Sequence, residues 1–232
     1  MKLHDWLDSI LNLFYPRVCA ACGDSLLKDE ETVCLKCRYT LPRTGYELNP
    51  DNPLAQTFYG RVRLHAVTAC FFFAKSGKVQ HLIHQLKYKG NKEAGIFLGQ
   101  QIGESIKEAP LFQGIDYLIP VPLHPKRERK RGYNQSLLIA KGISEVTGIP
   151  IGDKYLVRGV YTETQTKKSA EERFKNVKDI FELRFADELK GKHVLLIDDV
   201  LTTGATLESC THQLENIPGI TISAATAACA GN

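Results

Sequence analysis

Residues 193–206 constrain the fold of this chain more than any other stretch. Four apolar residues, 194–197, follow Gly191 and end at two aspartates, which is typical of a buried strand in a parallel sheet. After Asp198 and Asp199 the chain passes into a helical pattern. Ligands of open α/β sheets bind at the carboxyl ends of strands, where a helix N-terminus offers unpaired N–H groups to an anion. The sequence therefore predicts an anion site directly after this strand.

The residues after the strand indicate which anion this is. Residues 202–206 carry three hydroxyls, one glycine and one alanine, which suits a phosphate cradle. Asp198 and Asp199 would repel the same phosphate, so we expect them to meet sugar hydroxyls or a magnesium ion. A ligand with both features is a ribose 5-phosphate. The segment contains no lysine, so it is not the Gly-x-x-x-x-Gly-Lys nucleotide loop. The simpler alternative is an ordinary strand that ends in an Asp-Asp turn, followed by a capped helix.

Residues 194–206 resemble the 5-phosphoribosyl-1-pyrophosphate (PRPP) motif of the type I phosphoribosyltransferases. That resemblance implies an α/β fold in which helices flank a mostly parallel sheet, and PRPP bound together with magnesium. The PRPP-binding residues that it implies in this motif are Asp198, Asp199, Val200, Leu201, Thr202, Thr203, Gly204, Ala205 and Thr206.

Four of the seven cysteines have the spacing of a metal site. Cys19 and Cys22 form one Cys-x-x-Cys knuckle, and Cys34 and Cys37 form a second one after eleven intervening residues. Two knuckles together make a closed tetrahedral site of four thiolates, which predicts structural zinc. A thioredoxin-like redox pair is the alternative, but that motif occurs singly and near a βαβ pattern. So small a module has little core, so zinc is expected to supply much of its folding free energy.

One segment rich in proline and asparagine predicts that the chain has two domains. The sequence Asn-Pro-Asp-Asn-Pro at 49–53 indicates a linker, so we expect an N-terminal helix and zinc ribbon at 1–50 and a phosphoribosyltransferase-like domain at 51–232. The helix is predicted over 6–14. No apolar run reaches the roughly 18 to 20 residues of a membrane span and no signal core is evident, so we expect a cytoplasmic protein without membrane insertion.

Strand and helix patterns alternate along the larger part. Besides the central strand, strands are expected at 66–74, 115–121, 155–157, 177–183 and 220–228, and helices at 79–86, 93–108, 136–147 and 205–215. Such alternation predicts a parallel sheet wrapped by helices.

A basic segment follows the strand expected at 115–121. Five of the six residues 126–131 are cationic, and we expect them to lie on a loop, where they suit a pyrophosphate or a nucleic-acid backbone. A solvated basic loop without a ligand is the alternative. The preceding residues resemble the pyrophosphate loop of the type I phosphoribosyltransferases, which adds Pro122, Leu123 and His124 to the expected PRPP-binding residues.

Residues 161–176 are almost free of apolar side chains and lie between two expected strands. Long polar loops inside compact α/β domains are often lids. By analogy with the family, this is the mobile loop that closes over PRPP. Lys167, Lys168 and Arg173 are then available to neutralise the leaving pyrophosphate, and with Asp198 and Asp199 they are the catalytic candidates.

The paired knuckles, the Leu-Lys-Tyr-Lys-Gly segment at 86–90, the basic segment, the polar loop and the PRPP motif occur in one order that resembles the ComF (ComFC) competence family. The resemblance implies a bacterial role in natural transformation, with single-stranded DNA and other DNA-uptake proteins as partners. The aromatic and basic residues expected to contact DNA are Lys87, Tyr88, Lys89, Arg127, Arg129, Lys130 and Arg131.

Two other functions remain open at this stage. The chain is an active phosphoribosyltransferase of nucleotide metabolism without a DNA role, or it binds PRPP or a nucleotide as a regulatory ligand without turnover. The sequence does not identify an acceptor or a catalytic base.

Overall fold

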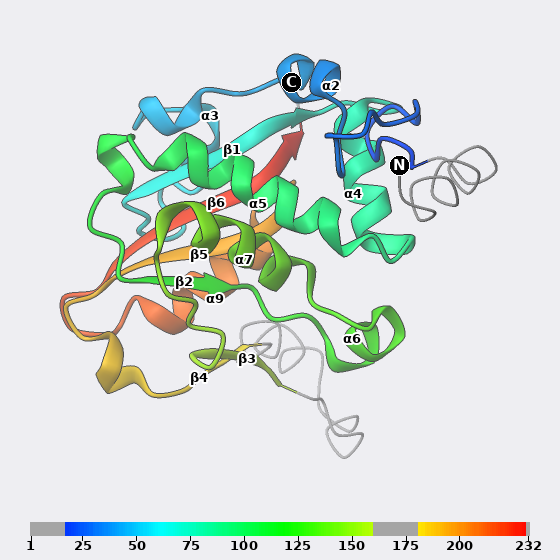
Figure 1. The fold of residues 1–232 in the computed structure, drawn as a ribbon. Coiled ribbons are helices and arrows are strands. Elements are labelled where there is room, and N and C mark those ends of the chain that lie inside the picture. The colour runs from blue at the N-terminus through cyan, green and yellow to red at the C-terminus, as the bar shows by residue number, and fades with distance from the viewer. Residues whose placement is uncertain (1–16, 160–180, 231–232) are drawn as a thin grey trace.

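The computed structural model describes residues 17–159 and 181–230 (Figure 1). Its centre is a four-stranded parallel sheet in the order β1 (Ala66–Phe73), β6 (Thr221–Ala230), β5 (His193–Leu201) and β2 (Tyr117–Pro120). Every neighbouring pair in this sheet is parallel, so the predicted fold class is confirmed.

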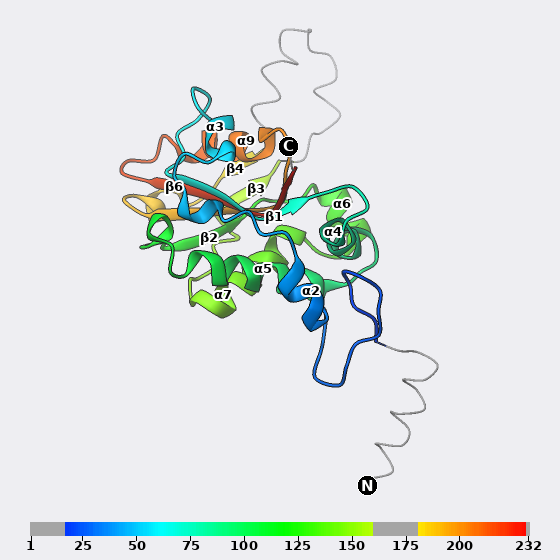
Figure 2. The ribbon, with the colours of Figure 1, turned by 90° about the horizontal axis from the view of Figure 1, so that it is seen from above.

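Helices cover both faces of the sheet. Figure 2 shows α5 (Lys92–Ile106) and α7 (Gln135–Thr147) on one face, and α3 (Pro53–Thr57) and α9 (Ala205–Leu214) on the other. Successive side chains of a strand point to opposite sides of the sheet, so the apolar run of β5 supplies buried residues to both faces. Leu195 and Ile197 are buried with α5 and α7, whereas Val194 and Leu196 are buried with α9.

The backbones of α5 and α7 approach each other closely through two glycines. A Cβ atom at Gly99 would overlap the carbonyl of Ile139, and a Cβ atom at Gly142 would overlap the carbonyl of Ile96. Only glycine permits such an approach. It fixes α7, whose first residues reach the candidate site, against α5.

The remaining elements lie around this core. Figure 1 places α4 and α6 beside the carboxyl ends of the strands. The remaining elements around the core are α2 (Leu35–Thr40), η1 (Tyr46–Leu48), α4 (Lys78–Tyr88), η2 (Pro110–Phe112), α6 (Pro125–Arg131), the antiparallel pair β3 (Leu156–Arg158) and β4 (Phe181–Leu183), and η4 (Ala186–Leu189).

The basic segment is a helix, so the loop predicted at 126–131 is wrong. Pro125 takes the first helical position, where its missing N–H costs nothing. His124 Nδ1 accepts from the backbone N–H of Lys126 at 3.1 Å, and Gly132 ends the helix with φ 83°. The high density of charge favoured a loop in the prediction, although Pro125 and Gly132 are typical of helix ends.

The central strand also runs past the point where the sequence ended it. The strand β5 continues through the two aspartates to Leu201, because its neighbour β6 extends far enough to pair with it. Asp198 lies opposite Thr226, and Leu201 lies opposite Cys229. The aspartates are therefore held by the sheet rather than by a turn.

Asn52, in the segment expected to be a linker, is buried. Its side chain accepts from the backbone N–H groups of Leu54 and Ala55 and donates to the carbonyl of Val67 at 2.8 Å. The N-terminal cysteines share a core with α4 and α5. The division near residue 50 stays a prediction.

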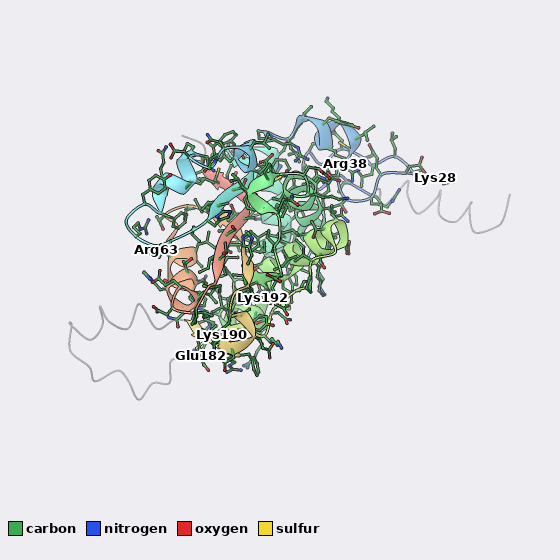
Figure 3. All side chains as sticks on the ribbon, turned by 90° about the vertical axis from the view of Figure 1, so that its left-hand side faces the viewer. Lys28, Arg38, Arg63, Glu182, Lys190 and Lys192 are labelled. Carbon is green, nitrogen blue, oxygen red and sulfur yellow. The ribbon has the colours of Figure 1, made fainter. Side chains whose placement is uncertain are left out.

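Some expectations fall on other parts of the chain. The helix at 6–14 and the polar loop with Lys167, Lys168 and Arg173 lie outside the described residues. Figure 3 shows Lys28 and Arg38 at one end of the molecule, on the N-terminal segment, and Glu182 and Lys190 far from them. Of the helices within 17–159 and 181–230, none has the length and apolarity to cross a membrane.

Candidate functional site

The two aspartates lie where three segments of the chain meet. Asp198 Oδ1 accepts from Ser136 Oγ at 3.1 Å and from the backbone N–H of Asp199 at 2.8 Å. Ser136 is held at the start of α7 by Asn134, whose Oδ1 accepts from the backbone N–H of Ser136 at 3.0 Å. Asn134 Nδ2 also donates to the carbonyl of Val121 at 3.0 Å. The end of β2, the start of α7 and the PRPP motif thus form one hydrogen-bonded unit.

This surrounding changes the acidity of Asp198. Burial and then the charge of Asp199 raise the pKa of Asp198 to about 7, against the hydrogen bonds from Asp199 and Ser136 and the charge of Lys87, which lower it. A carboxyl group poised near neutrality ionises readily when a cation approaches. The pair of carboxylates therefore has the oxygen donors and the electrostatics that suit a magnesium ion.

Asp199 has a cationic partner from a distant segment. Lys87, in the last turn of α4, places its Nζ 2.8 Å from Asp199 Oδ1, and the two side chains are 23% and 14% exposed. The end of α4 is held in place because Tyr133 Oη donates to the carbonyl of Leu86 at 2.6 Å. The segment at 86–90 thus belongs to the site, which its sequence alone did not establish.

The loop after β5, which the sequence predicts to be a phosphate cradle, turns tightly at Gly204. Gly204 adopts φ 79°, a conformation that favours glycine, and a Cβ atom there would lie 2.8 Å from the ring of Phe58. Helix α9 begins directly afterwards without a side-chain cap from Gly204. First-turn N–H groups have no acceptor within their helix and can donate to an anion. In the structure, the N–H of Ala205 donates to Thr203 Oγ1 at 3.5 Å. Arg61 Nη1 donates to the carbonyl of Thr203 at 3.2 Å and steadies the loop.

The expected pyrophosphate loop adjoins the aspartates. Val121 donates its backbone N–H to the carbonyl of Ile197 at 2.9 Å, which places the following Pro122 and Leu123 beside the end of β5. His124 ends this loop and uses Nδ1 to cap α6. The two loops expected to hold PRPP therefore follow adjacent strands at one edge of the sheet.

A basic cleft, which we call the α4–α6 cleft, lies between these two helices. Its volume is about 430 Å³. The guanidinium of Arg131 lies 5.7 Å from the ring centroid of Tyr88. Of the seven residues expected to contact DNA, five line the cleft, and Lys89 and Arg129 do not. The lining residues are Lys87, Tyr88, Gly90, Arg127, Lys130 and Arg131.

Four residues of this site were not predicted from the sequence. Ser136, Phe58 and Arg61 are ordinary residues until the fold brings them to the motif. Arg158 at the end of β3 has a buried Nε that has no hydrogen-bond partner among the described residues. Burial, and then the charge of Arg127, lower the pKa of Arg158, whereas Asp198 is one of the groups that raise it. The position of Arg158, shortly before the polar loop, was the one available signal.

The four cysteines of the knuckles meet as the spacing predicts. The ligand atoms of Cys19, Cys22, Cys34 and Cys37 all lie within 4.8 Å of one another. Burial raises the pKa of Cys19, but backbone N–H donors, first that of Cys34 at 3.3 Å, outweigh it and lower the value to about 7. Burial raises the pKa of Cys22 and Cys37. Four convergent sulfurs fit a tetrahedral metal ion.

Comparison with known proteins identifies the family. A model described as a phosphoribosyl transferase domain matches residues 135–230. The DNA utilization protein YhgH of Escherichia coli (strain K12) is 33% identical over 193 residues, which cover 82% of this chain and 80% of that protein. The competence protein F of Haemophilus influenzae is 38% identical over 101 residues, 43% of this chain and 44% of that protein. The chain belongs to the ComF family.

Further relatives agree with this membership. The competence protein ComFC of Bacillus subtilis is 27% identical over 195 residues, 78% of this chain and 77% of that protein. The matches to the YhgH proteins of two Salmonella strains span 56% of each relative's length. Among solved structures, the glutamine PRPP amidotransferase of B. subtilis, complexed with ADP and GMP, aligns with a TM-score of 0.43 and 21% identity over 59% of this chain and 26% of its own. The match of residues 135–230 and the four convergent sulfurs show that this ComF-family chain combines a type I phosphoribosyltransferase domain with an N-terminal cluster of four cysteines.

Proposed function

We propose that this protein binds PRPP with magnesium at the carboxyl end of β5, and that it handles single-stranded DNA during DNA uptake. The observation that carries the proposal is the arrangement of Asp198 and Asp199 between the loop that contains Gly204 and the loop after β2. The names of the ComF relatives, which refer to competence and DNA utilization, support the second part.

Each part of PRPP has residues of suitable chemistry. The 5-phosphate is assigned to residues 202–206 and the α9 N-terminus, and the pyrophosphate to Pro122, Leu123 and His124. Asp198 and Asp199 face the ribose hydroxyls and would hold the magnesium ion, which supplies positive charge to the phosphates. Lys167, Lys168 and Arg173 are proposed to neutralise the leaving group.

If PRPP is turned over, a nucleophile displaces pyrophosphate at C1 of the ribose through an oxocarbenium-like transition state. The chain then contributes positioning and charge neutralisation rather than a covalent nucleophile. A phosphoribosyltransferase of nucleotide metabolism without a DNA role, and a protein that senses PRPP without turnover, are the alternatives. A protein that only senses PRPP has no acceptor. For an enzyme, the identity of the acceptor shows whether it acts in nucleotide metabolism or on DNA.

The remaining expectations become proposals of the same kind. We assign the ion of the four cysteines as zinc, because a closed four-thiolate site is typical of structural zinc. We also propose a cytoplasmic location and partners among other DNA-uptake proteins, with the zinc ribbon ending near residue 50.

Calorimetric titration of PRPP with magnesium chloride tests the central proposal. We expect binding to the wild type and none to the double variant Asp198→Asn, Asp199→Asn, because amides are weaker ligands for magnesium and cannot supply its negative charge. Asp187→Asn is the matched control, since Asp187 is exposed on η4, where it pairs with Lys190, and lies outside the motif. Equal affinity of wild type and double variant, or no binding to the wild type, contradicts the proposal.

A further inference from the structure

We propose that Lys87 couples the two ligands, so that single-stranded DNA in the α4–α6 cleft and magnesium–PRPP at the aspartates strengthen each other's binding. This inference rests on the proposed function and adds regulation to it. It arises from one side chain that belongs to both sites.

Lys87 lines the α4–α6 cleft, and its ammonium also forms an ion pair with Asp199 at 2.8 Å. An ammonium is a compact charge on a flexible four-carbon stem, so small rotations move it between neighbouring acceptors. In the structure it neutralises a carboxylate of the PRPP motif. A phosphate that reaches the cleft therefore competes with Asp199 for the ammonium of Lys87.

A magnesium ion at Asp199 changes this balance. The ion carries the same sign of charge as Lys87, so the two repel each other over a few ångströms. We expect Lys87 to turn from Asp199 toward the cleft when the ion binds, which raises the positive charge there. Conversely, a phosphate that attracts Lys87 leaves Asp199 free for the ion. By linkage, the effect of each ligand on the other has the same size.

The cleft favours a nucleic-acid strand. Arg127, Lys130 and Arg131 add three cations to Lys87, and the described part of the chain contributes no carboxylate to the lining. The ring of Tyr88 is 68% exposed at this cleft, close to the guanidinium of Arg131. Cations that follow a backbone and an exposed ring that stacks on a base are the two elements of single-strand binding.

The test measures the affinity for a fluorescent single-stranded oligothymidine by anisotropy. The wild-type protein is titrated in EDTA, in magnesium chloride and in magnesium chloride with PRPP, all at equal ionic strength. We expect magnesium–PRPP to tighten oligonucleotide binding about fivefold or more, the lower end of typical allosteric coupling. In a calorimetric titration, the oligonucleotide should tighten PRPP binding by the same factor.

Three variants assign this coupling to Lys87. Lys87→Met should abolish the coupling, so that its oligonucleotide affinity is the same with and without magnesium–PRPP. Lys130→Met removes another cation of the cleft, whereas the ion pair that the structure describes for Asp199 is with Lys87. This variant should weaken oligonucleotide binding in every buffer and keep the coupling. Lys107→Met is the control for charge loss elsewhere, because Lys107 is exposed at the end of α5. Thermal unfolding verifies that all three variants fold.

The outcomes separate this inference from the function on which it rests. PRPP binding that needs the aspartates, with the same oligonucleotide response in wild type and Lys87→Met, overturns the coupling alone. A decrease in oligonucleotide affinity with PRPP, or displacement of the oligonucleotide by inorganic pyrophosphate, also overturns it, because pyrophosphate would then occupy the cleft. If PRPP does not bind, the proposed function fails, and equal responses of wild type and Lys87→Met to magnesium alone overturn the coupling as well.

Discussion

The hydroxyl of Ser136 donates a hydrogen bond to Asp198 Oδ1 at 3.1 Å, although 62 positions separate the two residues. This bond joins the start of α7 to β5, and it favours the ionised form of Asp198 against the effect of burial. A residue in the first turn of a packed helix is thus one of the groups that set the acidity of the candidate ligand.

Removal of this hydroxyl should raise the pKa of Asp198 above its value of about 7. In Ser136→Ala we expect weaker magnesium binding at pH 7, because a hydrogen bond to a charged group contributes about 1.5–3 kcal/mol. Calorimetry over a pH series measures the change as a shift of the binding curve to higher pH. Ser144→Ala removes another hydroxyl of α7, which donates to the carbonyl of Ile149, and should leave the curve in place.

The pKa of Asp198 also predicts how stability depends on pH. Unfolded aspartate titrates near about 3.9, so the folded protein holds the proton more tightly, and its stability falls as pH rises from about 4 to about 7. Asp198→Asn removes this dependence. Because each pKa unit corresponds to about 1.4 kcal/mol, the variant should gain a few kcal/mol relative to wild type at pH 8 compared with pH 4.

Urea unfolding at these two pH values measures that gain. Asp187→Asn is the control, because pairing with Lys190 lowers the pKa of this exposed carboxyl group, so its loss brings no gain at pH 8. A difference between Asp198→Asn and wild type that is the same at both pH values would show that burial of Asp198 has no cost to the folded protein.

Gly204→Ala should damage the phosphate cradle through two effects. The φ of 79° costs a residue with a Cβ atom roughly 1–2 kcal/mol, and the added atom meets the ring of Phe58 at 2.8 Å. We expect lower stability together with a loss of PRPP affinity, measured by urea unfolding and calorimetry. Gly114→Ala, in the turn before β2, carries the same strain at φ 71° with no described neighbour within 4 Å, so it should lose stability and keep PRPP affinity.

The sequence predicted the parts of this molecule that depend on local patterns. The apolar run at 194–197, the alternation of strands and helices and the spacing of the four cysteines each correspond to an observed element or cluster. The PRPP motif could be recognised for the same reason, because its residues are contiguous. Periodicity and spacing carry this information without knowledge of the fold.

The parts that it did not predict depend on contacts between distant segments. The ion pair of Lys87 and Asp199 spans 112 positions, and no property of either segment indicates the other. The strand β5 continues to Leu201 only because β6 offers a partner for pairing. The helix Pro125–Arg131 was not predicted, because the high density of charge favoured a loop. Pro125 and Gly132 nevertheless mark the ends of this helix.

The four-cysteine cluster predicts one tightly held metal ion per chain. Elemental analysis of gently purified protein should find it, and Cys34→Ser should lose it, because a closed tetrahedral site needs all four thiolates. The side chains of Cys19, Cys34 and Cys37 lie in the same core as α4 and α5, so loss of the ion should also lower the thermal stability of the protein. Cys70→Ser is the matched control: Cys70 is buried beside Ser105, at 3.9 Å, and outside the cluster, so its metal content should equal that of wild type. Equal metal content in Cys34→Ser and wild type would mean that the four sulfurs converge for packing alone.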